Sequence, residues 1–172
     1  MTRTSLSLAG FAVALAGLVA LAGCGSSGGS TSSSTEAASG TTTGSSGGGT
    51  ATIDVADNPK LGQVLVDSQG NTVYLFEKDE SDESYCNGSC AKVWPPVTTN
   101  GEPKAGSGVS GKLTTLKRED GTTQVVFDGH PLYTYVKDTD TEDAYGNEVD
   151  QFGAEWYGLR PNGEKTEEGS ES

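Results

Sequence analysis

The chain has 172 residues, with 24 Asp and Glu against 11 Lys and Arg. A length of this order predicts one domain. Because Arg3 is the only charged residue before Cys24, the chain from Cys24 onward carries 10 − 24 = −14 charges. An acidic surface of this kind repels phosphate backbones and anionic headgroups, which argues against nucleic-acid binding and against a polybasic contact with a membrane.

The first 23 residues have the pattern of a secretory signal peptide, with Arg3 followed by an apolar run from Leu6 to Ala22 and then small residues. Their end, Leu21-Ala22-Gly23-Cys24, resembles the bacterial lipobox. The resemblance implies cleavage before Cys24 and acylation of its thiol, with chains of the palmitate type holding the protein on the outer face of the cell membrane. An ordinary secreted chain, in which Cys24 is incidental, is the alternative.

Residues 24–50 consist almost entirely of Gly, Ser and Thr. Such a segment buries too little apolar area to offset the entropy of ordering, so we expect a lipid-anchored flexible tether. The β domain is expected over 51–163, and 164–172 is expected to be an acidic disordered tail.

The first half of the domain shows the period-two pattern of β-strands. On its last strand, Tyr74 and Phe76 should face one side, while Val73 and Leu75 face the other. The predicted strands are 53–55, 63–66 and 72–77.

A pair of cysteines, Cys86 and Cys90, encloses an Asn-Gly turn after this strand. In an oxidising compartment the default for such a pair is a disulfide. Two thiolates and the imidazole of His130 would also suit copper, which gives a redox or copper-handling module as an alternative.

The second half repeats the first. Gly70 to Asp79 recurs as Gly129 to Asp138, with an offset of 133 − 74 = 59 at the tyrosines. Each half closes with a tryptophan, Trp94 or Trp156. The predicted strands of this half are 112–117, 122–127 and 132–137. We therefore predict a mainly β fold, in which two related β-meander repeats (about 61–97 and 112–160) form one small sandwich-like or barrel-like domain.

The two motif copies are Tyr74-x-Phe76-x-x-Asp79 and Tyr133-x-Tyr135-x-x-Asp138. With them the chain resembles the bacterial lipoproteins named for a Yx(FWY)xxD motif, the secreted repeat of unknown function. This resemblance implies an extracytoplasmic, anchored repeat protein without an established biochemical activity.

The repeated residues have a structural and a functional interpretation. The motif aromatics, together with Trp94 and Trp156, are expected to pack in the core; the alternative is a stacking platform for a glycan or a quinone-like ligand. Asp79 and Asp138 are expected to cap their own turns, with a cation or ligand contact as the alternative. The acidic loop 138–143 has calcium-like spacing but lacks the Gly and Glu of an EF-hand.

The sequence contains one His and none of the common hydrolase or phosphate-binding motifs. A hydrolase built on Asp79 and Asp138 is the only catalytic alternative. We therefore expect a non-enzymatic, membrane-anchored extracytoplasmic lipoprotein without a cofactor. It would present an acidic β-repeat domain to an envelope protein or glycan; the alternative is the redox or copper module of Cys86, Cys90 and His130.

Overall fold

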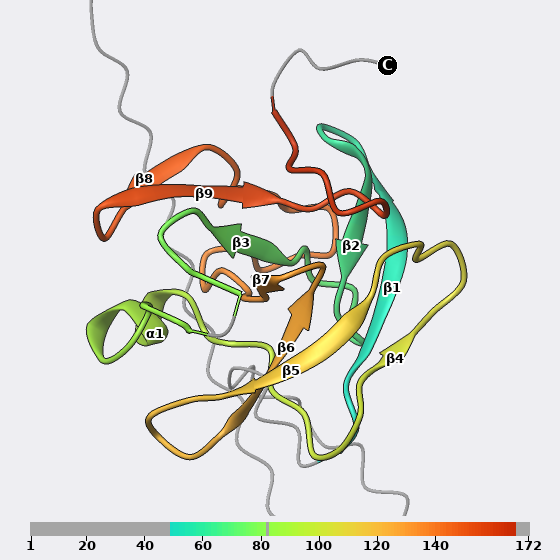
Figure 1. Ribbon diagram of the computed structural model, residues 1–172. Helices are drawn as coiled ribbons and strands as arrows, with labels where there is room; N and C mark the ends of the chain where they lie inside the picture. Colours follow the sequence, from blue (N-terminus) through green and yellow to red (C-terminus); the bar gives the residue numbers. More distant parts are fainter. Residues whose placement is uncertain (1–48, 82, 168–172) are drawn as a thin grey trace, which may run out of the picture. The chain divides into compact units, whose positions relative to one another are not determined.

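The protein is mainly β, as predicted, with 38% of the described residues in strands and 4% in helix. The computed structural model describes residues 49–81 and 83–167 (Figure 1). In this part of the chain the strands form three small sheets and no closed barrel; their orders are β2-β1-β4, β3-β9-β8 and β5-β6-β7. The first-repeat elements are β1 (Thr52–Asn58), β2 (Gly62–Val66), β3 (Tyr74–Phe76) and α1 (Ser89–Val93). The others are β4 (Lys104–Ala105), β5 (Leu113–Lys117), β6 (Thr123–Phe127), β7 (His130–Pro131), β8 (Val149–Gln151) and β9 (Ala154–Gly158).

Each repeat opens with an antiparallel hairpin, β1–β2 in the first and β5–β6 in the second. The valine-rich strands β2 and β6 bury most of their side chains, which explains why β-branched residues occupy them. Asp128 and Gly129 then form a two-residue turn with positive φ of 47° and 90°, as a tight hairpin requires. This turn pairs Phe127 with His130 and so places His130 next to the hairpin.

Strand β3 separates two hydrophobic clusters, as its period-two pattern predicts. Val73 and Leu75 enter one cluster and Tyr74 and Phe76 the other. The aliphatic cluster comprises Ile53, Leu65, Val73, Leu75, Val97, Val125, Phe127, Leu132, Tyr157 and Leu159. The aromatic cluster comprises Tyr74, Phe76, Cys86, Cys90, Trp94, Tyr133, Tyr135 and Trp156.

The two repeats exchange the segments that carry their tryptophans. Strand β9 of the second repeat pairs with β3 of the first, with Phe76 opposite Trp156. Pro96 of the first repeat forms the matching bridge to Tyr133 of the second. In Figure 1, β3 accordingly lies between β9 and β7. The sheet β3-β9-β8 therefore contains strands of both repeats.

The predicted strand 132–137 is mostly absent. Only His130–Pro131 forms a strand, and Tyr133 makes isolated bridges. The partner segment contains Pro95 and Pro96, which have no amide hydrogen to donate. The hydrogen bonds between the two segments are consequently few: the Thr134 amide donates to the Pro95 carbonyl at 2.9 Å, and the Val97 amide donates to the Leu132 carbonyl at 2.8 Å.

Four elements were not predicted. Helix α1 begins directly after the Asn87-Gly88 turn, and β4 lies in the connection that we expected to be a loop. Strands β8 and β9 form a hairpin around Phe152 and Gly153, both of which have positive φ. A non-glycine residue at such a φ is unusual, and this concealed the turn in the sequence.

The domain extends beyond the predicted boundary at residue 163. Thr166 is buried, and its amide donates to the Gly158 carbonyl at 2.9 Å, so 164–167 does not belong to a frayed tail. At the other end, the Gly49 carbonyl accepts the Asn100 amide. The predicted signal peptide, Cys24, the tether up to residue 48, and 168–172 lie outside the described residues. Within the described ranges, no helix has the length and apolar character needed to cross a bilayer.

Candidate functional site

The motif residues of the two repeats form two crossed tyrosine–aspartate pairs. The Tyr74 hydroxyl donates to Asp138 Oδ2, and the Tyr133 hydroxyl donates to Asp79 Oδ2. Asp79 Oδ1 also accepts the Tyr85 amide at 2.8 Å, and Asp138 Oδ1 accepts the Tyr145 amide at 2.9 Å. Each carboxylate thus closes its own acidic loop and also ties that loop to the other repeat.

Burial perturbs all four groups of these pairs. It raises the pKa of Asp79 from 3.8 to about 6, against the opposing effect of the hydrogen bonds from Tyr133 and the Tyr85 amide. It raises the pKa of Asp138 in the same direction. The pKa values of Tyr74 and Tyr133 are also raised, by burial first and then by the neighbouring carboxylate. Both phenols therefore remain protonated and serve as donors.

Four aromatic rings form a continuous stack inside the aromatic cluster, in the order Phe76, Trp156, Trp94, Tyr135. The successive centroid distances are 4.1, 3.9 and 4.1 Å. Trp94 and Trp156 are fully buried, and both indole nitrogens donate to Gln151, to its side-chain oxygen and its carbonyl respectively. Because both indole faces are covered, the stack belongs to the core and offers no exposed platform for a glycan.

The predicted disulfide between Cys86 and Cys90 is present, and both residues are buried. Beside it lies the buried guanidinium of Arg118. Its Nη2 donates to the Cys86 carbonyl at 2.6 Å and to Asn87 at 2.8 Å. Its Nη1 donates to Gln124 at 2.6 Å. Arg118 therefore holds the disulfide-bearing loop against strand β6.

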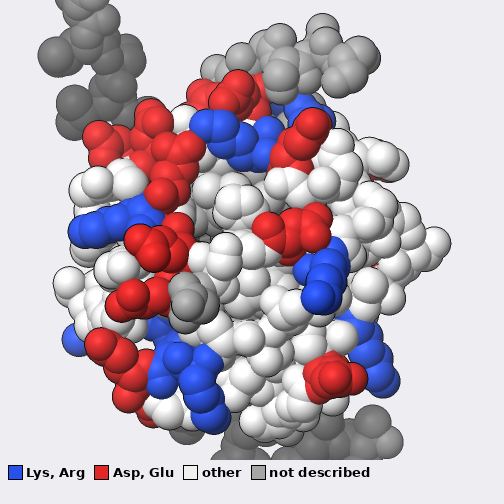
Figure 2. Space-filling view, in the orientation of Figure 1, with Lys and Arg blue, Asp and Glu red and all other residues white. Residues whose placement is uncertain are grey.

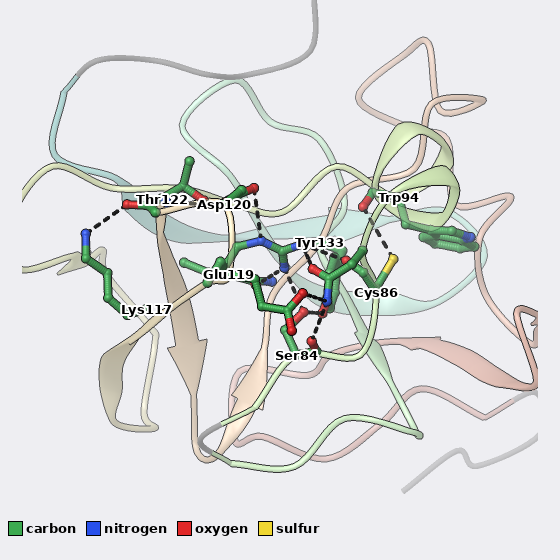
Figure 3. Close-up of polar contacts among 12 residues, drawn as sticks. Ser84, Cys86, Trp94, Lys117, Glu119, Asp120, Thr122 and Tyr133 are labelled. Carbon is green, nitrogen blue, oxygen red and sulfur yellow. Dashed lines mark hydrogen bonds and ion pairs between the residues drawn. The ribbon is translucent and has the colours of Figure 1, made fainter.

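A chain of hydrogen bonds connects this guanidinium with Asp79. Figure 3 shows the part of it at Ser84 and Tyr133. Arg118 Nη1 donates to Ser84 Oγ at 2.7 Å, and Ser84 Oγ lies 2.6 Å from the Tyr133 hydroxyl. Since the Tyr133 proton goes to Asp79, the Ser84 hydroxyl is the donor to Tyr133. Two neutral hydroxyls thus separate the positive and negative ends of the chain.

Sequence analysis did not identify Arg118, which appeared to be the first residue of an exposed hairpin turn. The structure instead buries its side chain to 1% exposure, with Asp120 Oδ2 3.7 Å from Nε. A buried guanidinium needs several acceptors, and here all of them except Gln124 come from residues more than 30 positions away, such as Ser84. No local pattern signals such partners.

A cavity of about 440 Å³ lies beside Asp79. Lys165, at its rim, pairs with Glu77 at 2.7 Å and with Glu167 at 3.1 Å. The pKa of His130 is lowered by burial, so its imidazole is neutral at pH 7. The lining residues are Leu75, Phe76, Glu77, Asp79, His130, Gly163 and Lys165. The sequence did not predict this cavity, because one wall comes from the presumed tail.

The metal-binding alternatives find no support in the described residues. No three His, Cys, Asp or Glu side chains are grouped there as a metal site would require. The thiols of Cys86 and Cys90 are joined in the disulfide, while His130 lines the cavity with Asp79. In the acidic loop, Asp143 Oδ2 accepts the amides of Thr139 and Asp140, so this carboxylate stabilises its own loop.

Comparison with protein families gives one match, which covers both halves of the chain. The family is described as a secreted repeat of unknown function, and it matches residues 55–98 and 114–159. The chain belongs to this family. As a member of the secreted-repeat family it is assigned an extracellular location, and the family description indicates no catalytic activity. Neither the curated proteins nor the solved structures contain a match.

Proposed function

We propose that this protein is a lipoprotein anchored through Cys24 to the extracytoplasmic face of the cell membrane, and that it presents its β-repeat domain without catalysing a reaction. The anchoring rests on the lipobox-like Leu21-Ala22-Gly23-Cys24 behind an apolar signal segment. The tether that follows would separate the domain from the headgroups by about 25–30 Å in root-mean-square span.

One observation carries the non-enzymatic part of the proposal: the repeated residues contact one another. The hydroxyls of Tyr74 and Tyr133 donate hydrogen bonds to the aspartates of the other repeat, and the repeated aromatics form a buried stack. A motif that recurs because chemistry needs it would leave a reactive group facing substrate. This motif instead holds the two repeats together, which leaves function to the surface of the domain.

The surface offers contact points for an envelope protein or a glycan. Acidic side chains spread over the face seen in Figure 2, with basic side chains between them. Several large apolar side chains are exposed, and Tyr145 is the most accessible at 55%. The others are Tyr85, Val136 and Phe152. Exposed tyrosines beside carboxylates suit recognition of polar, ring-containing partners.

Replacement of Cys24 by serine in the full chain tests the anchor. In a bacterial host, the unaltered chain should be found in the membrane fraction, and its N-terminal peptide should begin at a Cys24 carrying the mass of acyl chains. The Cys24→Ser chain should be released from the membrane. An unaltered chain that is soluble, or that begins at another residue, would refute the anchoring.

A further inference from the structure

We propose that the cavity beside Asp79 binds a small organic cation: a protonated amine whose ammonium group pairs with the Asp79 carboxylate and whose apolar body lies along strand β3 at Leu75 and Phe76. This inference goes beyond the proposed anchoring and does not depend on it.

The cavity has the size and the rigid wall that a small ligand needs. Its volume of about 440 Å³ lies within the range of about 300–1,000 Å³ typical of ligand sites. Leu75 and Phe76 belong to strand β3 and are almost fully buried. This strand is paired with β9, with Leu75 opposite Tyr157 and Phe76 opposite Trp156, which fixes its position. The apolar wall is therefore preformed.

The charges around the cavity favour a cation. The ammonium group of Lys165 is shared between Glu77 and Glu167 and also lies 4.3 Å from the Tyr157 ring centroid, so it is already engaged. His130 is neutral at pH 7, as described above. Glu77 and Lys165 thus neutralise each other, and the Asp79 carboxylate remains as the unbalanced charge of the wall.

Among the described residues, no cationic side chain is in direct contact with the carboxylate of Asp79. Its hydrogen-bond donors are the Tyr133 hydroxyl and the Tyr85 amide, both neutral. Arg118 reaches it only through Ser84 and Tyr133. A partly buried carboxylate with neutral donors gains most from a cation that enters its pocket, since the charge pair is then shielded from water.

The second repeat shows that the fold does not require this arrangement. Asp138 makes the same two hydrogen bonds as Asp79. At the repeat offset of 59, however, Glu77 corresponds to Val136 and His130 to Asn71. The polar groups that surround Asp79 in the cavity are therefore features of one repeat only. Asp138 supplies a control that matches Asp79 in charge and in structural role.

The test uses the secreted full chain with Cys24→Ser, which leaves every described residue unchanged. Benzylammonium is the probe, and benzyl alcohol and benzoate are its neutral and anionic counterparts, titrated by calorimetry at about 0.15 M salt, where surface attraction is screened. We expect saturable one-to-one binding of benzylammonium and much weaker binding of the other two. Binding of benzyl alcohol with equal affinity, or no binding of benzylammonium, would overturn the proposal.

Two aspartate variants distinguish binding in the cavity from non-specific attraction to an acidic protein. Asp79→Asn should weaken benzylammonium binding by about tenfold or more, because the charge pair is lost. Asp138→Asn removes the same charge and should change the affinity less than about threefold. Equal losses in both variants would indicate non-specific attraction to an acidic protein and would overturn the proposal.

A third variant keeps the test decisive if Asp79→Asn does not fold. Glu77→Val with His130→Asn introduces the residue types found at the equivalent positions, Val136 and Asn71, and leaves both crossed pairs intact. Its circular dichroism and thermal unfolding should resemble those of the parent, while benzylammonium binding falls several-fold with the loss of an acidic wall residue. A folded double variant that binds as tightly as the parent would contradict the assignment.

Discussion

Tyr74 and Tyr133 are hydrogen-bonded to each other through both backbone amides, at 2.8 and 3.0 Å. They are the first aromatic residues of the two motif copies, so the repeats meet at equivalent positions. From this point the two side chains cross in opposite directions, Tyr74 to Asp138 and Tyr133 to Asp79. The relationship is a local two-fold symmetry within one chain, and it suggests how each crossed pair can be tested against the other.

The first prediction concerns energetic coupling between the repeats. Tyr133→Phe and Asp79→Asn should each lower the free energy of unfolding by about 1–3 kcal/mol, because a buried hydrogen bond is lost. The double variant should show a coupling energy of about 1 kcal/mol or more. Urea unfolding of the two single variants and the double variant measures it.

The matched control combines Tyr133→Phe with Asp138→Asn. Tyr133 does not donate to Asp138, so these effects should add within about 0.5 kcal/mol. Coupling of Tyr133 to Asp138 instead of Asp79 would show that each repeat pairs within itself, contrary to the crossed arrangement.

The second prediction is that mild acid stabilises the domain. The pKa of Asp79 is raised from 3.8 to about 6, and that of Asp138 is raised as well. The stability associated with the protonated carboxyls is fully present below about pH 4 and is lost as the pH rises through about 6. Since Asp79 is partly exposed, we expect a gain of only about 1 kcal/mol on going from pH 7 to pH 5.

Chemical unfolding at a series of pH values tests this. The pKa values of Asp120 and Asp143 are lowered, mainly by hydrogen bonds, and these groups act oppositely below about pH 4. The comparison therefore belongs above that pH. It is made in a His130→Asn background, because the pKa of His130 is lowered by burial and its protonation between pH 7 and pH 5 opposes folding. Asp79→Asn should flatten the dependence, and an equally steep slope in that variant would assign the effect to general charge repulsion.

The third prediction concerns the buried guanidinium of Arg118. Arg118→Lys should lower the free energy of unfolding by about 2–4 kcal/mol. The guanidinium donates to Ser84, Gln124 and the Cys86 carbonyl at once, and an ammonium group cannot reproduce this planar set of hydrogen bonds. The exposed neighbour Lys117 provides the control, and Lys117→Met should change stability by about 0.5 kcal/mol or less. Equal effects in thermal unfolding would contradict a structural role for Arg118.

The fourth prediction is that the disulfide resists reduction in the folded protein. Cys86 is fully buried and Cys90 nearly so. Treatment of the native domain with dithiothreitol and then iodoacetamide should therefore add no mass, whereas the same treatment in urea should add one alkyl group to each of the two cysteines. Replacing both cysteines by alanine should cost about 2 kcal/mol, because the closed ring is small. Rapid labelling of the native protein would instead support the redox alternative.

The sequence was sufficient for the features that depend on neighbouring residues. Alternation placed Tyr74 and Phe76 opposite Val73 and Leu75 because successive side chains on a strand point to opposite faces. The disulfide followed from the short spacing of Cys86 and Cys90 in an exported chain.

The sequence was insufficient for the features that depend on distant partners. The pairing of β3 with β9, the acceptors of Arg118 and the wall at Lys165 all join residues far apart in the chain. No local periodicity encodes such a register. The repeat offset was the only indication of such pairing in the sequence. It was compatible with each motif strand pairing within its own half or with the other half.

The exchange of tryptophan segments determines when, during synthesis of the chain, the first repeat can fold. Phe76 pairs with Trp156, 156 − 76 = 80 positions later, and the Leu65 amide donates to the Leu159 carbonyl, 159 − 65 = 94 positions later. The first repeat therefore cannot complete its sheet until nearly all of the second has been synthesised. Contacts of this separation also make folding slow. A chain that stays open this long is well suited to being threaded across a membrane before it closes.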